Sequence, residues 1–164
     1  MQSPPVLAPD RGPDVKFPPP LLFATGLGGG VLLDRVLVSP FGHVIPATLP
    51  LQVAGIVLGV LGLVCVYTGI ITFRRARTAI YPNQPAVQVV SHGIYRYTRN
   101  PMYLGLTALY VGGVLVLGSL GALLLLPVVH VLLFSFVITR EEAYLHRAFP
   151  EDYAAYTSRV RRWL

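Results

Sequence analysis

Charged residues and cysteines are both scarce in this chain. Of its 164 residues, 54% are hydrophobic and only 12% are charged, whereas an average soluble domain has about 25% charged residues. The hydrophobic residues also form runs that are too long for the buried helices of a soluble protein. The single cysteine, Cys65, lies inside such a run, which excludes an internal disulfide and favours a simple packing role for the thiol. These features predict an integral membrane protein.

Four apolar segments are candidate membrane-spanning helices. Residues 51–73 include no charge, and residues 120–139 form a second apolar run; as helices they would measure about 34 Å and about 30 Å, enough to cross a bilayer core. Residues 103–117 would form a shorter helix of about 22 Å. Residues 20–38 are interrupted by an Asp-Arg pair at 34–35, near one end of the run, where charges are tolerated. The sequence predicts an all-α integral membrane protein with about four transmembrane helices.

Glycines recur at four-residue spacing in the first two of these segments. Gly26 and Gly30 form one such pair, and Gly55 and Gly59 form another. Small residues at this spacing let helix backbones approach closely within a membrane. We expect these contacts to form within one chain rather than between two copies.

The positive charges predict the orientation of the chain. The formal net charge is +6, and in a membrane protein such an excess reports topology more often than a nucleic-acid partner, so none is expected. With four spans, twelve of the thirteen Lys and Arg residues fall on one side, and the loops 39–50 and 118–119 on the other side contain none. The positive-inside rule then places both termini in the cytoplasm.

Polar and aromatic residues gather where the third predicted span begins and where the fourth ends. Residues 92–105 are HGIYRYTRNPMYLG, and REE follows at 140–142. A short turn between the two spans would bring both stretches to one membrane face. Tyrosine rings can cover an adenine ring or a cation. Glu141 and Glu142 are expected at a helix C-terminus, where they oppose the helix dipole, so they need a positive partner, either Arg96 or Arg99 or a cationic ligand. The pattern predicts an anionic, aromatic pocket at the cytosolic face; no metal site is expected.

Some of these residues also have purely structural interpretations. Asn100-Pro101 is a typical helix start, with Asn as the N-cap and Pro in the first turn. Gly93 suits either a tight turn or the close approach of a ligand. His130 lies at membrane depth, three residues after Pro127, so it either lines the lower part of the pocket or binds a carbonyl freed by the proline.

The residues after the fourth span are predicted to form cytosolic or interfacial helices. Apolar residues recur at helical spacing in 144–149 and again in 153–163, with Pro150 between the two stripes. Tyr153 and Tyr156 of the second stripe would lie at headgroup level or contact a substrate. The arginines at 159–162 favour contact with anionic headgroups over a role at the substrate.

The two polar stretches together resemble the signature of integral membrane methyltransferases. RNPMYLG at 99–105, followed by REE at 140–142, is similar to sequences in isoprenylcysteine carboxyl methyltransferases and phospholipid N-methyltransferases. The tail from 141 to 164 resembles the isoprenylcysteine branch and its bacterial relatives. The resemblance covers roughly residues 68–164. Isoprenylcysteine enzymes usually carry His at the position of Asn100, and the Asn-Pro-Met-Tyr form is closer to phospholipid methyltransferases, so the acceptor class stays open.

The resemblance implies a cofactor, S-adenosylmethionine, and a lipidic or small apolar methyl acceptor in the membrane. The cofactor-binding residues carried over to this chain are His92, Gly93, Tyr95, Arg99, Asn100, Tyr103, Glu141 and Glu142. The candidates for catalytic roles are Arg99 and Glu142. The candidates for contact with the acceptor are His130, Tyr153 and Tyr156.

Composition and the resemblance together suggest how the chain is organised. Residues 1–19 are Pro-rich and are expected to be disordered, residues 20–73 would form the first two transmembrane helices, and residues 74–164 would form the catalytic half. The likeness to bacterial relatives implies the plasma membrane of a bacterium as the location.

Two other functions stay open on the sequence alone. A membrane reductase of the steroid reductase type would bind NADPH, whose phosphates suit the arginine-rich loops but would be repelled by Glu141 and Glu142. A non-catalytic membrane module would bind lipids through its basic tail and would not depend on Glu141. Cofactor binding separates the three readings, whereas the acceptor and the choice among O-, N- and S-methylation are not fixed by the sequence.

Overall fold

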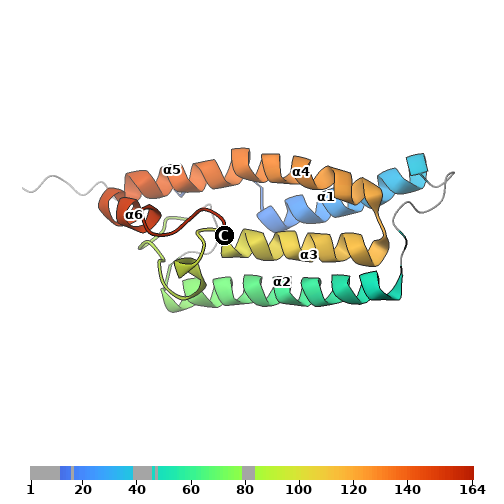
Figure 1. The fold of residues 1–164 in the computed structure, drawn as a ribbon. Coiled ribbons are helices and arrows are strands. Elements are labelled where there is room, and N and C mark those ends of the chain that lie inside the picture. The colour runs from blue at the N-terminus through green and yellow to red at the C-terminus, as the bar shows by residue number, and fades with distance from the viewer. Residues whose placement is uncertain (1–11, 16, 39–45, 47, 79–83) are drawn as a thin grey trace, which may run out of the picture.

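The computed structural model describes residues 12–15, 17–38, 46, 48–78 and 84–164. All the regular structure in these residues is helical, which confirms the predicted all-α class. The α-helices are α1 (Pro19–Leu33), α2 (Leu49–Arg75), α3 (Pro101–Leu117), α4 (Leu120–Leu133), α5 (Thr139–Ala148) and α6 (Pro150–Thr157). Figure 1 shows the long helices side by side in a bundle, with α5, α6 and the α2–α3 connection at one end.

Two helices in the described part of the chain are long and apolar enough to cross a membrane. They are α2, with 27 residues and a mean hydropathy of 2.4, and the continuous helix Leu120–Ala148, with 29 residues and a mean hydropathy of 2.5. Only 17% of the apolar window in α2 is buried within the protein, so most of its hydrophobic surface faces outward, as in a lipid-facing helix. The helices α1 and α3 are apolar but have 15 and 17 residues. The predicted number of four spans therefore stays a prediction.

Glycines bring α2 and α3 into backbone contact. A Cβ atom added to Gly62 would lie 2.5 Å from the carbonyl oxygen of Gly105, and one added to Gly105 would lie 2.7 Å from the carbonyl oxygen of Gly62. Gly55 and Gly112 face each other in the same way further along the pair. These two helices run antiparallel, so the end of α2 lies beside the start of α3 (Figure 1).

The helices α1 and α4 form a second closely packed pair. A Cβ on Gly30 would collide with the backbone of Ala122, and one on Gly26 would collide with the side chain of Val129. Together with Gly55 in α2, these contacts confirm that the glycine spacing in the sequence serves packing within one chain. Because both helix pairs are antiparallel, the loops gather at the two ends of the bundle.

The helix that begins with α4 continues well past the apolar run. A π-helical turn, η4 (Phe134–Ile138), follows α4 and leads directly into α5. The expectation that Glu141 and Glu142 lie at a helix C-terminus was therefore wrong, because both belong to the first turn of α5 and the helix continues to Ala148. Their carboxylates do not oppose the dipole of a helix end.

Part of the predicted disordered segment, residues 1–11 and 16, lies outside the described residues. Of the described part, Val15 is buried in the same core cluster as Phe23 of α1. The backbone carbonyl of Asp14 accepts a hydrogen bond of 2.9 Å from Nη1 of Arg140. Residues 13–15 thus lie against the end of the bundle that carries α5.

Candidate active site

The two predicted polar stretches meet at one end of the bundle, and the α3–α4 hairpin is what brings them together. Gly118 ends α3 in the left-handed conformation (φ 63°), which lets the chain reverse at once into α4. The start of α3 and the start of α5 therefore lie side by side. The hydroxyl of Tyr103 in α3 donates a 2.7 Å hydrogen bond to Oε1 of Glu141 in α5, so the two stretches are joined directly.

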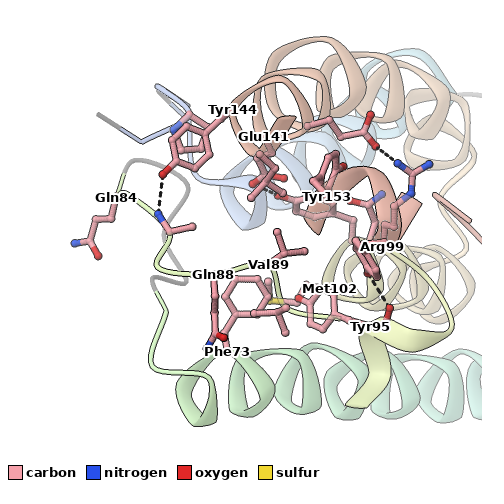
Figure 2. Close-up of a pocket in the computed structure, with 18 residues that line it drawn as sticks. Phe73, Gln84, Gln88, Val89, Tyr95, Arg99, Met102, Glu141, Tyr144 and Tyr153 are labelled. Carbon is pink, nitrogen blue, oxygen red and sulfur yellow. Dashed lines mark hydrogen bonds and ion pairs between the residues drawn. The ribbon is translucent and has the colours of Figure 1, made fainter. Parts of the chain in front are cut away.

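Residues from both stretches line one pocket (Figure 2). Its empty volume is about 910 Å³, a figure that includes the solvent at its open mouth. Its lining includes these sequence-predicted residues: Tyr95, Arg99, Asn100, Tyr103, Glu141, Glu142, Tyr153 and Tyr156. The other three predicted residues, His92, Gly93 and His130, are not in the lining.

Glu142 is held by two arginines. Its Oε1 accepts hydrogen bonds from Arg162 Nε at 2.9 Å and from Arg99 Nη1 at 3.2 Å, while its Oε2 accepts one from Arg162 Nη2 at 2.7 Å. A bidentate arginine–carboxylate pair of this kind has one preferred geometry and is stronger than a neutral hydrogen bond. The predicted arginine partner is therefore Arg99, joined by Arg162, whereas Arg96 contacts the hydroxyl of its neighbour Tyr97.

Glu141 is in a different situation from its neighbour Glu142. It accepts the hydrogen bond from Tyr103 but forms no ion pair with any residue that the structure describes. Burial of its carboxyl group raises the pKa to about 7; the hydrogen bond from Tyr103 opposes this shift, and the charge of Glu142 adds to it. Glu141 lies beyond the predicted span, which ends at residue 139. A cationic ligand in the pocket would supply the missing positive charge.

Two polar atoms near the pocket are buried without a hydrogen-bond partner in the described residues. They are Nε of Arg99 and the hydroxyl of Tyr95. Buried polar groups in folded proteins almost always have a partner, so each such group needs an explanation. Both residues line the pocket, and the hydroxyl of Tyr95 lies on the side of α2, 3.6 Å from where a Cβ on Gly69 would be.

The wall opposite Glu141 is aromatic and apolar. Phe73, Tyr95 and Met102 lie together near the end of α2 (Figure 2). The rings of Phe73 and Tyr95 have centroids 5.1 Å apart with an interplanar angle of 57°. A flat, apolar ligand group can pack on such a surface. The pocket therefore has a charged side on α5 and an apolar side on α2 and α3.

The connection between α2 and α3 supplies a further wall, which sequence reasoning missed. The hydroxyl of Tyr144 accepts a 2.9 Å hydrogen bond from the backbone N–H of Ala86, and Gln88 Nε2 donates at 2.7 Å to the carbonyl of Ala76. The lining residues that the sequence did not predict are Pro13, Phe73, Gln84, Ala86, Gln88, Val89, Val90, Met102, Tyr144 and Leu145. The available signals were the length of this connection and the apolar stripe that contains Tyr144.

The residues outside the lining have local structural roles. Gly93 has a φ of 61°, and a Cβ there would lie 3.1 Å from Oγ1 of Thr72, so the glycine serves a tight turn. His92 is exposed at the start of the short helix η3 (Gly93–Arg96). His130 lies in the bundle, where Nε2 is 3.1 Å from Thr107 Oγ1 and Nδ1 is 3.0 Å from the carbonyl oxygen of Leu126.

Tyr153 and Tyr156 do not present their rings to lipid headgroups, which was one of the two roles predicted for them. Their exposed fractions are 2% and 5%, and the hydroxyl of Tyr156 donates a 2.7 Å hydrogen bond to the carbonyl of Tyr95. The stripe on α6 packs against η3 because the short break at Phe149 folds α6 back toward the pocket. Both tyrosines therefore form part of the wall of the site.

Comparison with known proteins identifies the family of the sequence. Residues 51–152 match the family model described as phospholipid methyltransferase. Protein-S-isoprenylcysteine O-methyltransferase of Schizosaccharomyces pombe is 39% identical over 72 residues, which cover 44% of this chain and 30% of that enzyme. An uncharacterized protein of Haemophilus influenzae is 38% identical over 67 residues, which cover 38% of this chain and all of that protein. No solved structure matches the chain.

Proposed function

Because the chain belongs to the phospholipid methyltransferase family, we propose that it is a membrane methyltransferase that uses S-adenosylmethionine to methylate a lipidic or small apolar acceptor. The observation that carries the proposal is the contact between the two signature stretches, in which Tyr103 binds Glu141 on the wall of a single pocket. The S. pombe relative is named for methyl transfer to isoprenylcysteine. This chain spans only about 30% of that enzyme's length, so the cofactor and the acceptor are both proposals.

The residues of the pocket fit the proposed cofactor. The sulfonium of S-adenosylmethionine is a cation, and Glu141 offers a carboxylate that has no cationic partner in the described structure. Tyrosine faces nearby add a favourable surface for a positive charge. The wall of Phe73, Tyr95 and Met102 suits the adenine ring. Arg99 offers its guanidinium to the amino-acid carboxylate, since its Nε has no hydrogen-bond partner among the residues that the structure describes.

When bound, S-adenosylmethionine supplies an electrophilic methyl group for in-line transfer to a nucleophile. The protein's own part is positioning, which accounts for much of the rate in such reactions. Arg99 is fixed by its ion pair with Glu142, and Glu141 is fixed by Tyr103. The part of the α2–α3 connection that carries Ala86 and Gln88 lines one side of the pocket.

The need for a base depends on the acceptor. A carboxylate or thiolate acceptor needs none, whereas an amine must first lose a proton. Glu141 can take that proton, because a carboxyl group whose pKa is raised to about 7 exchanges protons readily at neutral pH. The same residue would therefore hold the cationic cofactor and, for an amine acceptor, serve as the base.

The proposal places the pocket at the cytoplasmic face of the membrane. Arg74 and Arg75 end α2 at the pocket end of the bundle, and Arg147 and Arg159 lie exposed at the same end. An excess of basic residues at one end fits the positive-inside rule. We propose that α1 to α4 all cross the bilayer and that a lipidic acceptor reaches the pocket from the membrane.

Isothermal titration of S-adenosylmethionine into the detergent-purified protein tests the proposal. We expect micromolar binding by the wild type and a large loss of affinity in Glu141→Gln and Tyr103→Phe. Glu151→Gln is the matched control, since Glu151 is exposed on α6 and is not in the lining. If the folded wild type bound NADPH instead of S-adenosylmethionine, a membrane reductase would replace the methyltransferase as the proposed function.

A further inference from the structure

We propose that Arg162 is a positioning residue for the active site, acting through Glu142. Through this contact the tail segment (residues 160–163) holds the polar stretches 92–105 and 140–142 together. This inference rests on the proposed function, because the site that it organises is the proposed cofactor pocket. In Figure 1 the end of the chain lies beside the start of α3, far in sequence from the segment that it contacts.

The side chain of Arg162 reaches the second stretch. Its Nε and Nη2 contact separate oxygens of Glu142, at 2.9 Å and 2.7 Å. The guanidinium carbon also lies 5.2 Å from the centre of the Phe134 ring, at a distance that suits a cation–π contact. With both oxygens of Glu142 engaged, the carboxylate has one defined orientation in which it can also hold Arg99.

The backbone of the tail segment reaches the first stretch. The carbonyl of Arg162 accepts hydrogen bonds from Asn100 Nδ2 at 3.0 Å and from Thr98 Oγ1 at 3.1 Å. The carbonyl of Arg161 accepts one from the backbone N–H of Arg99 at 3.0 Å. Thr98 and Asn100 are both buried, so these bonds are shielded from water.

These contacts also correct the capping interpretation of Asn100. Asn100 holds the N-cap position of α3, but its side chain makes no capping hydrogen bond. Its amide instead binds the carbonyl of Arg162. The residue therefore ties the tail segment to the start of α3, and Arg99 is oriented from both sides, through its backbone by Arg161 and through its side chain by Glu142.

The neighbouring tryptophan anchors the tail segment. Trp163 is partly buried and packs against the core cluster that contains Tyr103 and Val137. It is also the single tryptophan of the chain. Its fluorescence therefore reports the position of the tail segment without any added label.

The alternative function of the tail arginines, contact with anionic lipid headgroups, predicts different effects of substitution. Arg159 is exposed, and its Nε donates to the carbonyl of Ala155, four residues earlier in the chain. If the tail acted through attraction to anionic lipid, loss of Arg159 and loss of Arg162 would have equal effects. If Arg162 positions Glu142, loss of Arg162 lowers the affinity for S-adenosylmethionine and loss of Arg159 does not.

The first test is a double-mutant cycle read by S-adenosylmethionine affinity. We expect Arg162→Gln to weaken binding by about tenfold or more, Arg159→Gln to leave it unchanged, and Arg162→Lys to restore part of it. In a Glu142→Gln background, Arg162→Gln should add no further loss, because its effect passes through Glu142. Equal effects of Arg159→Gln and Arg162→Gln, or full additivity with Glu142→Gln, would overturn the positioning role.

The second test needs no cofactor. Acrylamide quenching of Trp163 fluorescence should rise in Arg162→Gln, because the tail segment loses its ion pair, and should not change in Arg159→Gln. Failure of the folded wild type to bind S-adenosylmethionine would overturn the proposed function itself. Normal cofactor binding together with unchanged affinity and unchanged quenching in Arg162→Gln would overturn the inference about Arg162 alone.

Discussion

Glu141 and Glu142 are adjacent in α5, but their carboxylates lie in opposite charge environments. Glu142 is bound by Arg99 and Arg162, whereas Glu141 accepts a hydrogen bond from Tyr103 and has no ion pair within the described structure. The carboxylate of Glu142 is thus fully used in ion pairs within the protein. The other is available for a cationic ligand.

Glutamine substitutions should separate these two roles. Glu142→Gln leaves two arginines without their partner, so we expect a loss of folding stability of about 1–3 kcal/mol. Glu141→Gln removes a buried carboxylate that lacks a cation, so the stability should be equal or higher while cofactor affinity falls. Thermal unfolding of both variants in detergent, next to titration with S-adenosylmethionine, provides the comparison. A stable Glu142→Gln beside an unstable Glu141→Gln would reverse this assignment.

Cofactor binding should depend on pH through Glu141. Its folded-state pKa is raised from 4.5 to about 7, so the carboxylate that attracts a sulfonium forms only as the pH rises through about 7. Affinity should therefore increase over that range, and Glu141→Gln should abolish the increase. Titrations at a series of pH values in the wild type and in this variant give the measurement. The same pH dependence in both would show that another group is responsible.

The raised pKa of Glu141 also predicts how folding stability changes with pH. Because the carboxyl holds its proton more tightly in the folded state, its contribution favours the folded state most below pH 4.5 and declines as the pH rises from there to about 7. The difference in unfolding free energy between the wild type and Glu141→Gln should follow this curve. A difference that grew in the wild type's favour over the same interval would contradict the burial of Glu141.

The sequence was enough to predict that Tyr103 and Glu141 come together at one end of the bundle. Tyr103 and Glu141 flank an apolar hairpin whose turn at Gly118 is short, so two spans of fixed direction had to bring them to one end. The need to balance two adjacent carboxylates predicted a positive partner but left Arg96, Arg99 and a cationic ligand open, and the structure pairs Glu142 with Arg99 and Arg162. The direction of a helix and the need for charge balance are local properties of the chain, whereas the choice among partners depends on the fold.

The other parts of the site depend on contacts that leave no periodic pattern in the sequence. Ala86 and Gln88 lie in an irregular connection, where their hydrogen bonds to Tyr144 and Ala76 decide the path of the backbone. The ion pair of Arg162 with Glu142 was missed because a tail arginine beside a tryptophan has the composition of a membrane-surface segment. His130, predicted as a possible lining residue, is not in the pocket lining, and the π-helical turn at 134–138 lies between it and Glu141 and changes the angle between their side chains from that of a regular α-helix.

Opening the wall formed by the α2–α3 connection should weaken cofactor binding. Tyr144→Phe removes the acceptor of the Ala86 N–H and leaves that donor unsatisfied. We expect a several-fold loss of S-adenosylmethionine affinity with the helical content unchanged, as measured by titration and circular dichroism. Tyr67→Phe is the control, since Tyr67 is 64% exposed on α2. An effect of equal size in the control would mean that the hydroxyl of Tyr144 has no special part in the site.

Glycine positions on the helices should differ sharply in their tolerance of alanine. At Gly62 an added Cβ would lie 2.5 Å from the carbonyl oxygen of Gly105, so Gly62→Ala has to push α2 and α3 apart and should lower the thermal unfolding midpoint by several degrees. At Gly28 a Cβ would meet nothing within 4 Å, and alanine is the better helix former there, so Gly28→Ala should raise the midpoint slightly or leave it unchanged. Thermal scans of the two variants under one detergent condition compare the same chemical change at a packed and an open site. If Gly62→Ala were as stable as Gly28→Ala, the α2–α3 contact would not be as close as the structure has it. Since that contact also sets the position of Tyr103, Gly62→Ala should weaken cofactor binding as well, whereas Gly28→Ala should not.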